Sequence, residues 1–159
     1  MGLEAGDLKL WRLTRAPFVA LDGQGALLNG ARYAPDGVPV VSLASEAALA
    51  VLIALRYQPR DLQGIPDDFV LGWTEVDAVP ERVPDSDEDA IRAFVGAWLA
   101  SCRSLLAAVP SRVLPEGDVV LFNPAHPAAA AVPPLTCRAF SFAECLHTPP
   151  MLARFQDSP

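Results

Sequence analysis

The expected fold depends most on residues 38–44, which read Val38-Pro39-Val40-Val41-Ser42-Leu43-Ala44. This short apolar run is typical of a buried strand, and Pro39 lies near its start, where a missing N–H is tolerated. The chain then runs almost directly into a segment, from about Ser45 to Tyr57, that predicts a helix. Ser45 can cap this helix and Glu46 suits its positive end. One helix face is apolar at Leu49, Leu52 and Ile53.

Working outward from this strand and helix, alternating or apolar runs predict further strands at residues 8–13, 69–76, 105–113, 118–122 and 137–142. A glycine-rich loop is expected at 22–30. The clearest helix follows the acidic loop 84–89, in which Ser86 and Asp89 have capping-box spacing. Its apolar stripe is Ile91, Phe94, Val95, Trp98, Leu99 and Cys102.

Two shorter helices are expected near the end of the chain. Asn123-Pro124 is typical of a helix start, and Thr148-Pro149-Pro150 can open a terminal helix. Strands outnumber helices and their order is mixed, so the sequence predicts an α+β fold. No linker separates two cores, and we therefore expect a single domain over residues 1–159.

Composition excludes several classes of protein. The chain has 159 residues, of which 52% are hydrophobic and 19% charged, so it is not intrinsically disordered. Its net charge is −7, and its arginines are scattered beside a single lysine, Lys9, so nucleic acid is not expected as a direct ligand. The longest apolar run, 47–55, is too short to cross a membrane, and the N-terminus has no signal-peptide core. A cytoplasmic protein without a membrane partner is expected.

Most chemical motifs are missing from the sequence. Cys102, Cys137 and Cys145 have no CxxC spacing, so we expect buried reduced thiols and neither a disulfide framework nor a zinc site. Two histidines are too few for most metal sites, and no metal is expected. Residues 23–28 begin like a dinucleotide fingerprint, but Leu28 stands at the third glycine position. No serine lies in a GxSxG motif, so nothing supports a serine hydrolase.

One pattern remains, and it runs through most of the chain in six segments. They are Leu10-Trp11-Arg12-Leu13, Gly30-Ala31-Arg32-Tyr33, Gly37 to Ala44, Val109-Pro110-Ser111, Leu121 to Pro127 and Phe140-Ser141-Phe142. In this order and spacing they resemble the RES domain family over about residues 8–146. The Gly-Ala-Arg-aromatic and Asn-Pro-x-His-Pro elements are the most specific parts of the resemblance.

The resemblance implies a fold, a substrate and a partner. RES proteins are bacterial toxins, usually encoded beside an Xre-type antitoxin that covers the active site, with a fold similar to ADP-ribosyltransferases. They consume NAD+ by phosphorolysis or hydrolysis of the nicotinamide–ribose bond. The expected substrate is therefore NAD+, and the expected protein partner is an Xre-type antitoxin. Homo-oligomerisation stays open.

Carried over by position, the family's pyrophosphate arginine is Arg32 and its serine is Ser111. Its tyrosine position holds Ser42, its glutamate position holds Ile53, and its closing Asp and Arg positions hold Ala143 and Cys145. The candidate catalytic residues are Arg32, Ser42 and Ser111. The candidate nucleotide-binding residues are Arg32, Arg12, Tyr33, Asn123 and His126.

Alternatives stay open for several of these residues. Ser42 is also compatible with a buried, backbone-bonded hydroxyl, and Asn123 and His126 with helix-start chemistry. Glu46, about 10 Å from Ile53 along one helix face, is a candidate replacement carboxylate. At the level of function, an active NAD+-consuming toxin competes with a degenerate RES domain that binds a nucleotide or an Xre-type partner.

Overall fold

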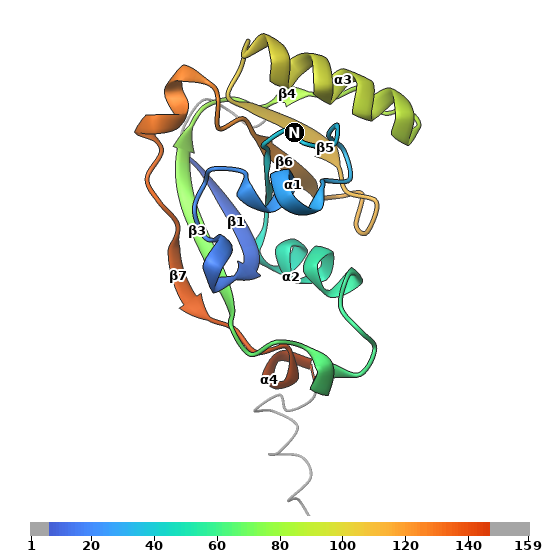
Figure 1. Cartoon of the computed structure of the whole chain (residues 1–159), viewed down its shortest axis with the longest axis vertical. Helices are drawn as coiled ribbons and strands as arrows, with labels where there is room; N and C mark the ends of the chain where they lie inside the picture. The colour runs from blue at the N-terminus through green and yellow to red at the C-terminus, as the bar shows by residue number, and fades with distance from the viewer. Residues whose placement is uncertain (1–6, 147–159) are drawn as a thin grey trace, which may run out of the picture.

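The computed structural model describes residues 7–146, whose strands form one mixed sheet of seven (Figure 1). The strands are β1 (Asp7–Arg15), β2 (Val41–Ala44), β3 (Phe69–Asp77), β4 (Glu81–Arg82), β5 (Leu106–Pro110), β6 (Asp118–Phe122) and β7 (Thr136–Ala139). Their order is β4-β5-β6-β2-β1-β3-β7. Only β4 and β5 are parallel among these neighbours. The expected α+β class is confirmed.

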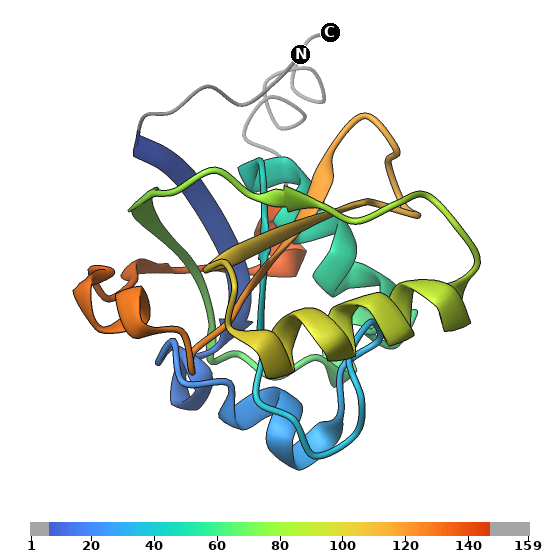
Figure 2. The ribbon, with the colours of Figure 1, turned by 90° about the horizontal axis from the view of Figure 1, so that it is seen from above.

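Helices and 3₁₀ turns surround this sheet. The helices are α1 (Gln24–Asn29), α2 (Ala47–Arg56), α3 (Glu88–Ser101) and α4 (Phe142–Leu146), and the 3₁₀ turns are η1 (Ala16–Phe18), η2 (Leu62–Gly64) and η3 (Pro127–Ala131). Helix α3 lies at one end of the molecule and α4 at the other, with α1 and α2 between them (Figure 1). Viewed from above, α3 runs alongside the half of the sheet that contains β5 and β6 (Figure 2).

The sheet has a weak seam at its centre. β1 pairs with β3 along its whole length, and β2 pairs throughout with β6. β1 and β2, in contrast, meet at one residue pair, Trp11 and Ala44. The two strands therefore diverge from this point and divide the sheet into a β4-β5-β6-β2 half and a β1-β3-β7 half.

Each half has its own apolar packing. The α3 stripe buries Ile91, Val95, Trp98 and Leu99 against the β5–β6 half, as its periodicity predicts. The Trp98 indole N–H donates to Ser104 Oγ at 2.8 Å, so this large buried ring keeps its polar atom bonded. On the other half, α2 packs against an aromatic cluster in which Phe142 lies edge-on to two neighbouring rings.

Several local predictions are wrong, and most concern helix starts. The expected loop at 22–30 contains α1, which follows Gly23 in a left-handed conformation. The cap of α3 is Asp87, whose carboxylate accepts the Ala90 N–H at 2.8 Å, so the Ser86–Asp89 box does not form.

Two other residues expected to cap the start of a helix do not do so. Ser45 Oγ accepts the Asp118 N–H at 3.0 Å, and α2 begins two residues later with Glu46 at its cap position. Residues 123–124 do not start a helix, because η3 begins at Pro127 behind His126. The expected helix at Thr148-Pro149-Pro150 lies outside the described residues.

The cysteine prediction is only partly correct. All three thiols are free, but Cys102 is half-buried and Cys137 and Cys145 are exposed. Cys137 is exposed because β7 is a short edge strand whose four residues all face solvent.

Candidate functional site

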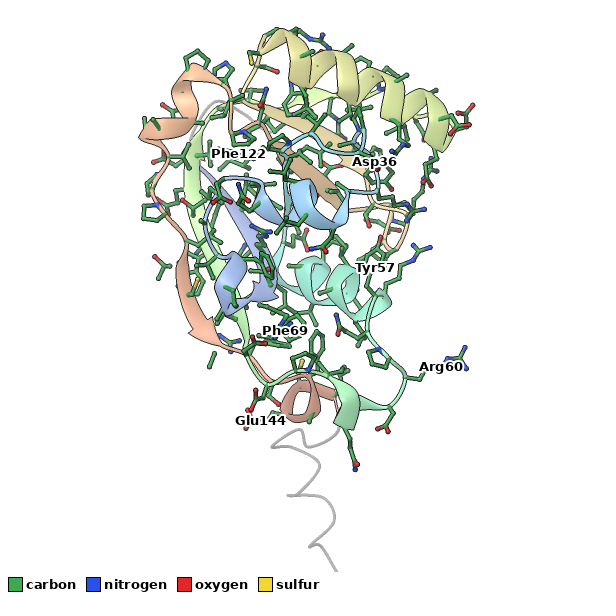
Figure 3. All side chains as sticks on the ribbon, viewed as in Figure 1. Asp36, Tyr57, Arg60, Phe69, Phe122 and Glu144 are labelled. Atoms are coloured by element: carbon green, nitrogen blue, oxygen red, sulfur yellow. The ribbon has the colours of Figure 1, made fainter. Side chains whose placement is uncertain are left out.

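A cavity of about 810 Å³ lies where β1 and β2 diverge. Its walls come from β1, β2, α2, the segment from α1 to Asp36, the first residue of α3 and the loop after β5. We call this cavity the seam cleft. Asp36 and Tyr57 lie at its rim on one side of the molecule, whereas Arg60 and Glu144 project outward (Figure 3).

Arg32 enters the seam cleft from the segment that follows α1. Its Nε and Nη2 donate to one oxygen of Glu88, at 3.3 and 3.2 Å, and its guanidinium lies 5.4 Å from the Tyr33 ring centre. Burial acts to lower the pKa of Arg32, but Tyr33, Glu88 and Tyr57 together raise it above its usual value. The side chain is therefore a fixed cation inside the cleft.

Arg12 enters the same cleft from β1. Its Nη1 is buried and, within residues 7–146, has no hydrogen-bond partner. Burial lowers the pKa of Arg12 and the nearby Asp22 opposes that shift, but a guanidinium remains charged at neutral pH. A buried donor without a partner is unfavourable, so this nitrogen lowers the stability of the folded state. The sequence alone did not establish whether Arg12 and Arg32 share a pocket, and the structure places both in the cleft lining.

Three more predicted residues also line the seam cleft. Ser42 is exposed on β2, which contradicts the buried-hydroxyl alternative. Ser111 is 2% exposed, and its Oγ accepts the N–H groups of Val113 and Leu114 at 3.2 and 3.3 Å. Tyr33 is buried beneath Arg32. Ile53, from the apolar face predicted for the helix at 45–57, lines the cleft as well.

Two predicted residues lie outside the seam cleft. Asn123 is buried, and its side chain donates to the Leu99 carbonyl at 3.2 Å and accepts the Ala125 N–H at 3.0 Å. His126 Nδ1 accepts the Ala128 N–H at 3.1 Å and so caps η3. The helix-start alternative therefore holds for His126, whereas Asn123 stabilises a turn before η3 and starts no helix.

The family model described as RES domain matches residues 9–143. The chain belongs to the RES domain family. Two relatives are the "Prs ADP-ribosylating toxin" of Sphingobium sp., 35% identical over 70% of this chain and 77% of the relative, and "Toxin Res" of Pseudomonas putida, 32% identical over 76% and 87%.

A solved structure supports the fold of this RES domain. The M. tuberculosis MbcT–MbcA toxin–antitoxin complex contains a chain that matches with a TM-score of 0.65 at 16% identity, over 88% of this chain and 87% of the other. Among residues 7–146, no helix combines the length and the apolar character that crossing a membrane requires. The same residues contain no cluster of side chains suited to holding a metal ion.

The cleft of this RES domain also contains residues that sequence reasoning missed. Glu88, Arg112 and Tyr57 all line it. Glu88 belongs to an acidic run before a helix, where a carboxylate is expected for helix stability alone, so its sequence context carries no functional signal. Glu46, the replacement carboxylate considered from the sequence, is not part of the lining.

Proposed function

We propose that this RES domain is the toxin of a toxin–antitoxin pair and cleaves NAD+ in the seam cleft. The observation that carries the proposal is that Arg12 and Arg32 both line one cleft. Guanidinium groups bind phosphate oxygens in a bidentate manner, which suits the NAD+ pyrophosphate. A relative named as an ADP-ribosylating toxin supports the same substrate class.

The remaining cleft residues have compatible roles. Tyr33 packs under Arg32 and limits its rotation. Ser111 Oγ already accepts two backbone N–H groups, so its own proton is left to donate to a ligand oxygen. Ser42 presents a second hydroxyl from β2 to the ribose.

The reaction breaks the bond between ribose C1′ and the nicotinamide nitrogen. The bonding electron pair leaves with nicotinamide, which becomes neutral, and the positive charge passes to the ribosyl ring. Water or inorganic phosphate then adds at C1′ and loses a proton to solvent. The products are nicotinamide and either ADP-ribose or its 1″-phosphate.

The protein partner we propose is an antitoxin of the Xre type. The matching solved fold comes from a toxin–antitoxin complex, and two curated relatives carry the name Toxin Res. An antitoxin that covers the seam cleft would exclude NAD+ from it. Both proteins would act in the cytoplasm, where NAD+ is held.

The test is NAD+ loss and nicotinamide release by the purified chain, with and without phosphate. Arg32→Ala is expected to lose turnover, whereas Arg60→Ala, which removes an equal charge from a side chain outside the cleft, is expected to keep it. Absence of turnover in the folded wild-type chain under both conditions would refute cleavage of NAD+.

A second candidate function follows from the wall formed by β2 and α2. Ser42 and Ile53 line the cleft where the family pattern has Tyr and Glu, so the domain is also suited to bind a nucleotide without cleaving it. In that case titration calorimetry detects NAD+ binding that Arg12→Ala weakens, while no nicotinamide appears. The double variant Ser42→Tyr/Ile53→Glu would then gain cleavage.

A further inference from the structure

Cleavage of the nicotinamide–ribose bond needs negative charge near C1′, because a preorganised carboxylate stabilises the oxocarbenium-like ring. Among the described residues that line the seam cleft, the carboxylates belong to Asp36 and Glu88. The Asp36 side chain is 94% exposed, and its nearest cation, Arg92, lies 3.8 Å away. The Glu88 side chain is 50% exposed and is held by Arg32 at 3.2 Å.

We propose that Glu88 is the catalytic carboxylate of this RES domain and faces the ribosyl cation as nicotinamide leaves. This inference rests on the proposed cleavage of NAD+. It assigns the role of the missing glutamate to a different element, the start of α3, in place of the α2 position that Ile53 occupies.

The orientation of Arg32 supports this assignment. A guanidinium has two edges that can each grip an anion, and Glu88 Oε2 occupies the edge formed by Nε and Nη2. The second edge, with Nη1, is left for a phosphate. One arginine then contacts the carboxylate and the pyrophosphate together. When that phosphate is the one that carries the nicotinamide ribose, C1′ of this ribose would lie beside the Glu88 carboxylate.

The backbone around Glu88 is fixed from two sides. Asp87 caps α3 through the Ala90 N–H at 2.8 Å. One helical turn beyond Glu88, Arg92 Nη1 donates to the carbonyls of Ala31 and Arg32 at 3.1 and 2.6 Å. α3 is therefore tied to the Arg32 segment through both backbone and side chain, which gives the carboxylate the preorganisation that electrostatic catalysis requires.

In the step itself, Glu88 remains ionised and takes no proton. The C1′–N bond breaks, nicotinamide leaves with the electron pair, and the Glu88 charge lies opposite the positive ring until water or phosphate adds. Removing one preorganised group of this kind typically lowers kcat about 10²–10³-fold. Because the group acts on charge that develops in the transition state, KM should change little.

The experiment compares Glu88→Gln with Asp89→Asn in the full chain. Both changes remove one carboxylate from the first turn of α3, but Asp89 is exposed and does not line the cleft. We expect Glu88→Gln to lose about a hundredfold or more in kcat with KM changed by less than a few fold. Asp89→Asn should retain wild-type kinetics, and Glu88→Asp should recover part of the lost rate. Thermal unfolding of each variant shows that the fold is kept.

Two results would overturn the assignment while leaving the proposed function intact. One is wild-type kcat in Glu88→Gln, and the other is a change confined to KM, which would reduce Glu88 to a partner of Arg32. If the folded wild-type chain does not cleave NAD+ at all, the proposed function fails and the role of Glu88 fails with it. The wild-type measurement thus separates the two failures.

Discussion

Replacing Arg12 by methionine should stabilise the fold while weakening the ligand site. Nη1 of Arg12 is buried without a partner among the described residues, and such a donor costs about 1–3 kcal/mol. Methionine keeps an apolar stem of similar length and removes the buried charge. The lost attraction to Asp22 is worth less than about 1 kcal/mol, since Asp22 is exposed. The net expectation is a gain of about 1–2 kcal/mol.

Urea and thermal unfolding measure this gain. About 1–2 kcal/mol corresponds to a rise in Tm of roughly 3–6 °C for a chain of this size. The matched control is Arg32→Met, which removes a partnered guanidinium and should give no increase, because it leaves Glu88 without its ion pair. NAD+ affinity should fall in both variants. An Arg12→Met protein destabilised by more than about 1 kcal/mol would refute the reasoning, since it would show that the buried guanidinium has a stabilising partner.

Two further perturbations probe the fold. In a urea titration, Gly23→Ala should lower the unfolding free energy by more than about 2 kcal/mol, because φ is +74° and a Cβ would lie 2.7 Å from the Val40 nitrogen. The control is Gly37→Ala, which has a similar φ of +75° but open space around the Cβ, and it should cost about 1 kcal/mol. Hydrogen bonding from Arg103 lowers the pKa of Glu81 despite partial burial, so this pair contributes stability above the unfolded pKa of about 4.3 and loses it as pH falls further. Glu81→Gln should therefore reduce the unfolding free energy at pH 7, and this deficit should shrink as pH falls below about 4.3; a deficit of constant size across this range would contradict the reasoning.

Sequence reasoning located elements whose own residues determine their structure. The strand expected at 118–122 has those limits in β6, and the apolar stripe from Ile91 to Leu99 is buried as its period requires. Sequence reasoning failed where tertiary contacts, and not the local sequence, determine the structure. Helix α1 is short and begins between two glycines, so its sequence resembles a loop. Strand β4 has two residues and exists only through pairing with β5.

The residues of the site also divide into those that the local sequence identifies and those that only tertiary contacts reveal. Arg32 was identifiable because its neighbours form a family motif, and its place in the cleft follows from the turn after α1. Glu88 was not identifiable, because 56 residues separate it from Arg32 and its contact depends on how α3 packs. Asn123 and His126 illustrate the opposite case. They belong to the Asn-Pro-x-His-Pro element of the family resemblance, but within the described structure their side chains form turn and cap hydrogen bonds and do not line the seam cleft.

The arrangement of the seam cleft separates ligand binding from bond cleavage. Arg12 projects from β1 and Arg32 from the segment after α1, whereas Ser42 and Ile53 belong to the β2–α2 wall. Neither arginine belongs to β2 or α2. Departures from the family pattern at Ser42 and Ile53 therefore leave in place the two arginines that we propose bind phosphate. NAD+ affinity and NAD+ turnover must accordingly be measured as independent quantities, because a Glu88 variant that binds NAD+ normally and cleaves it slowly is the outcome this geometry predicts.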